Sequence, residues 1–260
     1  MKALPFAAPP GTKLVRLLGR GSSFSVGVVL LDGHPAIAKR PLPGEQHAVG
    51  PVERERRVLE QLAGAGFPRL LRAGDDETGP YLVESLLEGS ALPAVVLGSP
   101  ARERVCRQLA ELVDTLHAAG DGALVHGDPS RANFIALSAD GCGMIDFGSS
   151  GFDGVPAVGR GTVPYAAPEL CREETPPSQM TDRYAISVLV AELCGVAFST
   201  RASGAAALLE IGERGHDLAA IDASDLAAPV RTALRGLLAF EPADRPASLR
   251  DLRAALDRVA

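Results

Sequence analysis

The sequence predicts an α+β protein with two lobes, in which a β-rich first third precedes a helical remainder. Residues 12–39 contain β-like runs, two of which are joined by Asp32-Gly33, and this dipeptide between β-runs is a strong hairpin signal. From residue 100 onward, apolar residues recur at helical spacing, most clearly over 101–120. Because strands and helices are segregated along the chain, the pattern favours two lobes over one wound sheet.

Length and composition are those of an ordinary globular protein. The chain has 260 residues, of which 46% are hydrophobic and 22% charged. Residues 1–11 resemble a short irregular lead-in without the apolar core of a signal peptide. We expect a single domain over 12–260, with an N-terminal lobe at about 12–84 and a C-terminal lobe at about 88–260.

The charge and cysteine patterns exclude several classes of function. The net charge of −6 indicates no basic surface for nucleic acid or for a membrane. The longest apolar stretch, 184–198, contains Glu192 and is too short to span a bilayer, so we expect a buried core helix there. The four cysteines lack metal-ligand spacing and are interpreted as reduced thiols. We therefore expect a cytoplasmic protein without nucleic-acid or membrane partners.

The remaining elements follow from periodicity. In 52–63, four apolar residues are spaced as on one helix face, and 79–87 resembles a strand. The helix over 101–120 is expected to end at Gly120, a typical C-cap residue. The other expected elements are short β-like segments at 124–128, 134–137 and 143–146, and helices at about 182–195, 204–214, 228–240 and 246–258.

Polar side chains gather around two neighbouring segments, LVHGDPSRANFI (124–135) and IDFG (145–148). Asp128, Asn133 and Asp146 place three oxygen-bearing side chains near tight turns, which can hold a hard cation such as magnesium. One of the carboxylates could instead accept a proton. The same residue types are also common in surface turns. Strands at 134–137 and 143–146 would bring Asn133 and Asp146 together at their paired ends.

Two further motifs lie in the first third of the chain. GRGSSFSV (19–26) is a glycine-rich turn between two strands, where backbone N–H groups can approach phosphate oxygens. Lys39 ends the next strand, ahead of a helix that carries Glu53 and Glu55. An ion pair between strand and helix could aim the ammonium at phosphates, although hairpin glycines and surface lysines are also common without such a role.

Taken in order, these motifs identify a resemblance. The chain from about 12 to 258 resembles a eukaryotic-like serine/threonine protein kinase domain of the kind also found in bacteria. The motifs that carry it, in family order, are GRG (19–21), AIAK (36–39), the helix Glu, HGD with Asn133, DFG (146–148) and GTVPYAAPE (161–169). The resemblance implies a bilobal kinase fold and phosphoryl transfer from ATP with Mg²⁺.

The resemblance also implies a role for each matching residue. Asp128 would orient the substrate hydroxyl and accept its proton, while Lys39 would contact the ATP phosphates and be held by Glu55, with Glu53 as the fallback partner. Asn133 and Asp146 would hold magnesium. The residues implied in nucleotide binding are Gly19, Gly21, Val26, Lys39, Ser85 and Leu87.

The segment from Asp146 to Glu169 decides the expected substrate. Small-molecule kinases that share HGD and Asn lack this segment, and Thr162 and Pro164 lie where the family contacts a peptide. We therefore expect Ser/Thr phosphorylation of an unidentified protein, with a regulatory protein as a further possible partner. An aminoglycoside-type phosphotransferase and a nucleotide-binding pseudokinase are the alternatives. Candidate autophosphorylation sites are Ser149, Ser150 and Thr162.

Several positions depart from the kinase pattern. Gly127 precedes Asp128 where many kinases have an Arg that pairs with a phosphorylated loop, so we expect activity without loop phosphorylation. Ser130 replaces the usual Lys, as in RIO-type kinases, and Arg131 is the candidate substitute. The loop around Asp128 therefore combines features of serine/threonine protein kinases with features of RIO-type kinases. Crowding of the nucleotide pocket is expected from Ile37 and from Phe24 or Ser23, and the role of Glu84, at or next to the gatekeeper, is left open.

Charged residues within the apolar C-terminal part need partners. Glu169, Asp182 and Arg245 lie in mostly apolar surroundings, where an unpaired charge is costly. We expect Glu169 and Arg245 to pair with each other.

Overall fold

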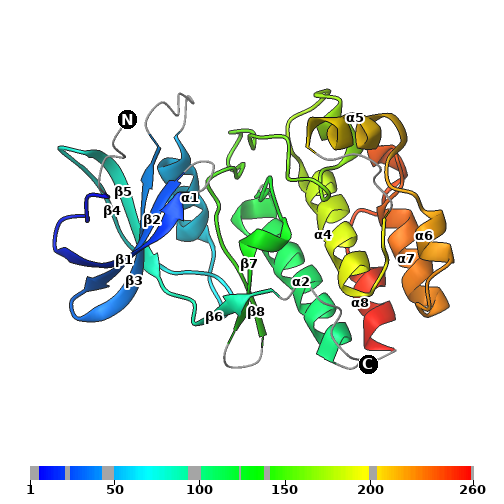
Figure 1. Cartoon of the computed structure of the whole chain (residues 1–260), viewed down its shortest axis with the longest axis horizontal. Helices are drawn as coiled ribbons and strands as arrows, with labels where there is room; N and C mark the ends of the chain where they lie inside the picture. The colour runs from blue at the N-terminus through cyan, green and yellow to red at the C-terminus, as the bar shows by residue number, and fades with distance from the viewer. Residues whose placement is uncertain are drawn as a thin grey trace.

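The computed structural model has the expected α+β architecture, with a β-sheet region followed by a helical region in a bilobal, kinase-like arrangement (Figure 1). The structure describes residues 6–20, 24–42, 50–92, 101–122, 124–137, 141–198 and 204–258. Within these ranges, none of the helices combines the length and apolar character needed to cross a membrane.

A five-stranded antiparallel sheet forms the N-terminal region. Its strands are β1 (Thr12–Arg20), β2 (Phe24–Leu31), β3 (His34–Pro41), β4 (Leu70–Asp76) and β5 (Gly79–Ser85), in the order β1-β2-β3-β5-β4. The expected hairpin is confirmed, because Asp32 and Gly33 connect β2 to β3 with φ values of 51° and 83°, as a two-residue hairpin turn requires. The sequence pattern missed β4, since its residues show no strict alternation and are mostly half-buried or exposed.

One helix, α1 (Pro51–Gln61), packs against β3, β4 and β5. The apolar stripe predicted over 52–63 is buried, and it includes Val58 and Leu59. The same buried face also carries two charged residues, Arg54 and Glu55. Since buried charges need partners, we expect both side chains to make polar contacts with other parts of the chain.

The helical region is built around α4 (Gln179–Leu193), which is buried on nearly every face. This confirms the core helix expected from the apolar stretch. A reciprocal capping box between Ser178 and Thr181 starts the helix. The long helix α2 (Ala101–Ala118) packs against α4 and α8. The other helices are α3 (Pro168–Cys171), α5 (Ala205–Arg214), α6 (Ala219–Asp222), α7 (Ala228–Leu237) and α8 (Arg250–Asp257).

The C-terminal helices are shorter than the periodicity predicts. α7 ends at Leu237 and α8 begins at Arg250, and a 3₁₀ turn at Pro242–Asp244 lies between them. Pro242 and Pro246 cannot continue a helix from the preceding residues.

A small antiparallel sheet lies beside the helical region, with the order β6 (Gly89–Ala91), β7 (Phe134–Leu137) and β8 (Gly141–Met144). In Figure 1 it lies between the five-stranded sheet and the helices. The β-like segment expected at 124–128 contributes only an isolated bridge between Val125 and Gly151. The antiparallel register of β7 and β8 pairs Phe134 with Met144, which brings the chain on either side of this pair together.

Candidate active site

Asn133 and Asp146 are brought together by the pairing of β7 with β8. The backbone N–H of Ile145 donates to the carbonyl of Asn133 at 2.9 Å, and both side chains line one cavity. Asn133 uses its amide nitrogen to donate to the backbone carbonyl of Asp128 at 2.8 Å. This bond leaves its amide oxygen as a potential cation ligand. Asp146 has a left-handed backbone, with φ of 65°, at the turn that begins DFG.

The donor set fits a magnesium ion that is also held by substrate phosphates. Asn133 and Asp146 supply oxygen ligands only, which Mg²⁺ prefers. Among the described residues, no group of three or more His, Cys, Asp or Glu side chains could hold a metal alone. Since Mg²⁺ is usually bound by one or two carboxylates plus substrate phosphates, two protein ligands that line one cavity are compatible with it.

Lys39 is paired with Glu55 of α1 across the interior of the N-terminal region. The Nζ of Lys39 lies 2.5 Å from Oε1 of Glu55, and both side chains are buried. The same Oε1 accepts the backbone N–H of Phe147 at 3.3 Å. Glu55 therefore joins β3, α1 and DFG. Glu53, the fallback partner, instead pairs with Arg56 and Arg57 on its own helix.

A second carboxylate also lies against Lys39. Oε1 of Glu84 is 2.9 Å from Nζ, and Glu84 is 2% exposed. Burial by itself lowers the pKa of Lys39, but the charges of Glu55, Glu84 and Asp146 outweigh it and hold that pKa well above its usual range. Burial raises the pKa of Glu55 and of Glu84, against the opposing effect of the Lys39 ammonium. The lysine is therefore a firmly charged centre with an excess of carboxylates around it.

A cavity of about 310 Å³ lies between the five-stranded sheet and the segments around β7 and β8 that carry Asn133 and Asp146. That volume is at the lower end of the range for small-molecule sites. The expected nucleotide-binding residues Val26, Lys39, Ser85 and Leu87 all line it. Gly19 pairs with Val26 in the β1–β2 ladder but is not among the lining residues. Gly21 lies outside the described residues.

The two residues expected to crowd the pocket, Ile37 and Phe24, also line this cavity. Phe24 is 2% exposed, and its ring lies 5.5 Å from Nζ of Lys39. A Cβ placed on Gly148 would come within 2.5 Å of the Phe24 ring, so the ring packs directly on DFG. An aromatic side chain therefore lies between Lys39 and DFG at the wall of this cavity.

Asp128 accepts a hydrogen bond from the hydroxyl of Thr162, with 2.8 Å between Oγ1 and Oδ2. Burial raises the pKa of Asp128, while the Thr162 hydrogen bond opposes the rise. A carboxylate with a raised pKa is a better proton acceptor than an ordinary aspartate. The contact joins the GTVPYAAPE segment to the catalytic-loop carboxylate.

Asp182, at the start of α4, positions the loop that carries Asp128. Its carboxylate accepts the backbone N–H of His126 at 2.7 Å and that of Gly127 at 3.0 Å. It also contacts Nε2 of His117 at 3.0 Å. Sequence analysis marked Asp182 as a charge in need of a partner, and the structure pairs it with backbone amides. The loop that carries Asp128 is therefore tied to a helix that is buried on nearly every face.

The segment after DFG is held by Arg54 of α1. Nη1 of this buried side chain donates to the carbonyls of Ser150 and Pro156, both at 2.8 Å. Gly127, which replaces the usual Arg, has φ of 86°, and a Cβ there would lie 2.8 Å from the carbonyl oxygen of Ser149. A side chain at this position would therefore be strained and crowded.

The structure also shows what surrounds Ser130, Arg131 and Ser150. Ser130 is 1% exposed, and within the described residues its hydroxyl has no hydrogen-bond partner. Arg131, the candidate substitute for the missing Lys, pairs with Glu192 at 2.8 Å, and Glu192 also accepts the Tyr165 hydroxyl at 2.8 Å. Arg131 is thus engaged with α4. Ser150 is fully buried and donates to the carbonyl of His126, so its phosphorylation would require the segment to move.

The sequence motifs assigned no role to Glu84 or to Arg54. Both are charged residues in otherwise apolar or core-facing patterns, and that position in the pattern was the available signal. The expected pair of Glu169 with Arg245 is confirmed, with two parallel contacts of 2.6 and 2.8 Å.

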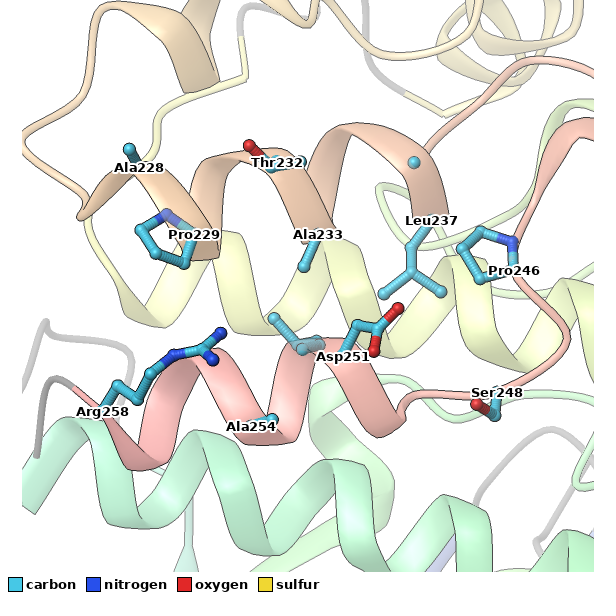
Figure 2. Close-up of a pocket in the computed structure, with 12 residues that line it drawn as sticks. Ala228, Pro229, Thr232, Ala233, Leu237, Pro246, Ser248, Asp251, Ala254 and Arg258 are labelled. Atoms are coloured by element: carbon cyan, nitrogen blue, oxygen red, sulfur yellow. The ribbon is translucent and has the colours of Figure 1, made fainter.

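A second cavity, of about 660 Å³, lies between α7 and α8 (Figure 2). Pro229, Ala233 and Leu237 of α7 face Asp251 of α8 and Arg258, which directly follows α8, across it (Figure 2). Although it is larger, it shares no lining residue with the cavity at Lys39. It contains none of the kinase-motif residues, so the smaller cavity is the candidate active site.

Comparison with known proteins agrees with this geometry. Residues 15–123 match the family model described as the phosphotransferase enzyme family, APH. Calcium-dependent protein kinase 14 of Oryza sativa subsp. japonica is 31% identical over 201 residues, which cover 69% of this chain and 37% of that protein. Serine/threonine-protein kinase SCH9 of Saccharomyces cerevisiae is 26% identical over 202 residues, which cover 72% of this chain and 24% of that protein.

A further relative, calcium-dependent protein kinase 34 of Arabidopsis thaliana, is 29% identical over 170 residues, which cover 62% of this chain and 32% of that protein. The chain thus spans well under half the length of these curated relatives. Fold, motif residues and matches together define a protein-kinase-like domain of the phosphotransferase class.

Proposed function

We propose that the chain is a protein kinase that transfers the γ-phosphoryl group of ATP to Ser or Thr hydroxyls of a protein. The observation that carries this proposal is the hydrogen bond between Thr162 and Asp128. It places the segment after DFG, which small-molecule kinases lack, against the carboxylate that would accept the substrate proton. The protein kinases among the relatives support the same substrate class.

In this proposal Asp128 orients the acceptor hydroxyl and takes its proton as the oxygen attacks the γ-phosphorus. Lys39, held by Glu55, binds the α- and β-phosphates, while Ser85 and Leu87 border the base. Magnesium, held by Asn133 and Asp146, would supply charge neutralisation on the phosphates. Transfers of this kind depend on positioning and electrostatic stabilisation more than on covalent help from the protein.

We also propose that transfer does not require phosphorylation of the segment after DFG. Arg54 already binds two backbone carbonyls of this segment, and Gly127 offers no cation for a phosphate. A phosphatase-treated protein is therefore expected to keep its activity.

The test is transfer of radiolabelled phosphate from ATP with magnesium, to the protein itself and to a generic basic protein. Asp128→Asn keeps the side-chain shape but cannot accept the proton, and we expect a loss of roughly 100-fold or more. ATP binding, measured separately by calorimetry, should persist in the variant. Label that is equal in wild type and variant would contradict the role of Asp128.

An aminoglycoside-type phosphotransferase is the second candidate, because the matching family model is that of the phosphotransferase enzyme family. ATP consumption with a panel of aminoglycosides discriminates between the two. Consumption that depends on an aminoglycoside, without label on protein, would favour the small-molecule substrate. ATP binding without transfer to either acceptor would favour a pseudokinase.

A further inference from the structure

Glu84 lies near the end of β5, directly before Ser85 and three residues before Leu87. It pairs in register with Ile37 of β3, and both residues line the cavity proposed for the nucleotide. Its carboxylate is 2% exposed and lies 2.9 Å from the ammonium of Lys39. The ion pair with Glu55 already holds this lysine in place, so positioning of Lys39 does not require Glu84.

The surroundings of Lys39 leave little room for a ligand. An ammonium has three N–H donors, and the carboxylates of Glu55 and Glu84 lie at 2.5 and 2.9 Å from it. The Phe24 ring covers a further side, and the whole residue is 4% exposed. A phosphate oxygen can reach Nζ without crowding only if one of these neighbours withdraws.

Charge leads to the same conclusion. One ammonium faces the carboxylates of Glu55 and Glu84, and the charge of Asp146 also acts on it. A nucleotide brings further negative charge into this buried space, where like charges repel strongly. Of the two direct neighbours, Glu55 is anchored additionally by the Phe147 N–H. In both glutamates the second oxygen, Oε2, is buried without a hydrogen-bond partner among the described residues, so the Phe147 contact is what distinguishes Glu55 from Glu84.

We propose that Glu84 competes with the phosphates of the nucleotide for Lys39 and thereby lowers the affinity of this site for ATP. Glu84 is a specificity-determining residue in this role, because the penalty falls on ligands that carry phosphates and not on the base or the sugar. The proposal rests on the nucleotide site of the proposed function, but it concerns binding and not transfer.

The test compares binding of ATP, ADP and adenosine to wild type and to Glu84→Gln by calorimetry at constant pH and magnesium. Because burial raises the pKa of Glu84, the pH is chosen high enough to ionise this carboxyl, and Glu84→Gln then removes the charge and keeps the shape. We expect about tenfold tighter binding of ATP and ADP, since one buried like charge is removed, and unchanged binding of adenosine. Glu60→Gln is the matched control, because this exposed carboxylate lies on the outer surface of α1. It should leave all three affinities unchanged.

Unchanged or weaker ATP binding in Glu84→Gln would overturn the proposal. An equal gain for adenosine would also overturn it, because the effect would then lie in the base pocket. Glu84→Met provides a second charge-free variant in case Glu84→Gln folds poorly, and it should show the same gain for ATP. A protein that gains ATP affinity in these variants but transfers no phosphate would support the competition while contradicting the proposed transfer.

Discussion

Thr162 and Asp128 show how one hydroxyl can tune a carboxylate that we propose as the general base. Burial raises the pKa of the Asp128 carboxyl, and the Thr162 hydrogen bond opposes this by stabilising the ionised form. A general base works only when ionised, so activity is lost as pH falls through its pKa. The acidic limb of the pH–rate profile should therefore lie above that of an ordinary aspartate.

Thr162→Ala is expected to move this acidic limb to higher pH. Removal of the hydroxyl leaves burial less opposed, so the pKa of Asp128 rises and the base is protonated sooner. The measurement is the pH dependence of kcat/KM for phosphate transfer. Thr162→Ser, which keeps the hydroxyl, should retain the wild-type profile. Coincident acidic limbs in Thr162→Ala and wild type would show that the hydrogen bond does not act on Asp128.

At the scale of elements, α1 does more than cover the sheet. It carries Glu55 towards Lys39 and Arg54 towards the segment after DFG. One rigid helix therefore couples the lysine to the backbone of that segment. Coupling of this kind needs charged side chains on the buried face of the helix. Arg54 and Glu55 meet this condition, because both are at most 4% exposed.

Arg54→Met should lower the stability of the protein and loosen the segment after DFG. The change leaves the carbonyls of Ser150 and Pro156 without this donor, at a cost of about 2–4 kcal/mol. We expect faster limited proteolysis within 149–160 and a kcat lower by about tenfold or more. Arg56→Met is the matched control on the same helix, because the ion pairs of Arg56 within the described part of the chain are surface pairs with Glu53 and Glu60. Similar proteolysis of the two variants would contradict the anchoring role of Arg54.

At the scale of the whole molecule, the pair of Glu169 and Arg245 connects the end of the segment after DFG with the chain between α7 and α8. Arg245 also donates to the carbonyls of Ala239 and Phe240, and its guanidinium stacks over the ring of Tyr184 of α4. Three distant parts of the C-terminal region thus meet at one buried cation.

Arg245→Leu is expected to lower the free energy of unfolding by about 3–5 kcal/mol, because Glu169 would remain buried without its partner. Urea denaturation measures the loss. Arg253→Leu provides the comparison, since it breaks a half-exposed pair with Asp114 and should cost only about 0–1 kcal/mol. If the two variants lost equal stability, the Glu169–Arg245 pair would contribute no more to the free energy of unfolding than the half-exposed pair does. The double variant Glu169→Met with Arg245→Leu should recover part of the loss.

Local patterns predicted much of the fold. The hairpin at Asp32-Gly33, the amphipathic stripe of α1 and the apolar length of α4 each depend on residues close in sequence. Elements without such patterns were missed or misplaced, as with the edge strand β4 and the ends of α7 and α8. Short-range periodicity cannot reveal an edge strand that is only partly buried.

Some features of the candidate site could likewise be predicted from the sequence, and others could not. By itself, the sequence determined the motif residues, their order and the proximity of Asn133 to Asp146, because these residues flank two antiparallel strands that are close in sequence. Only the tertiary structure decided which charges meet: that Glu84 joins Glu55 on Lys39, and that Arg54 binds a segment 96 residues away. Such contacts depend on the burial of distant elements against one another, and a buried charge takes whichever partner the packing brings within reach.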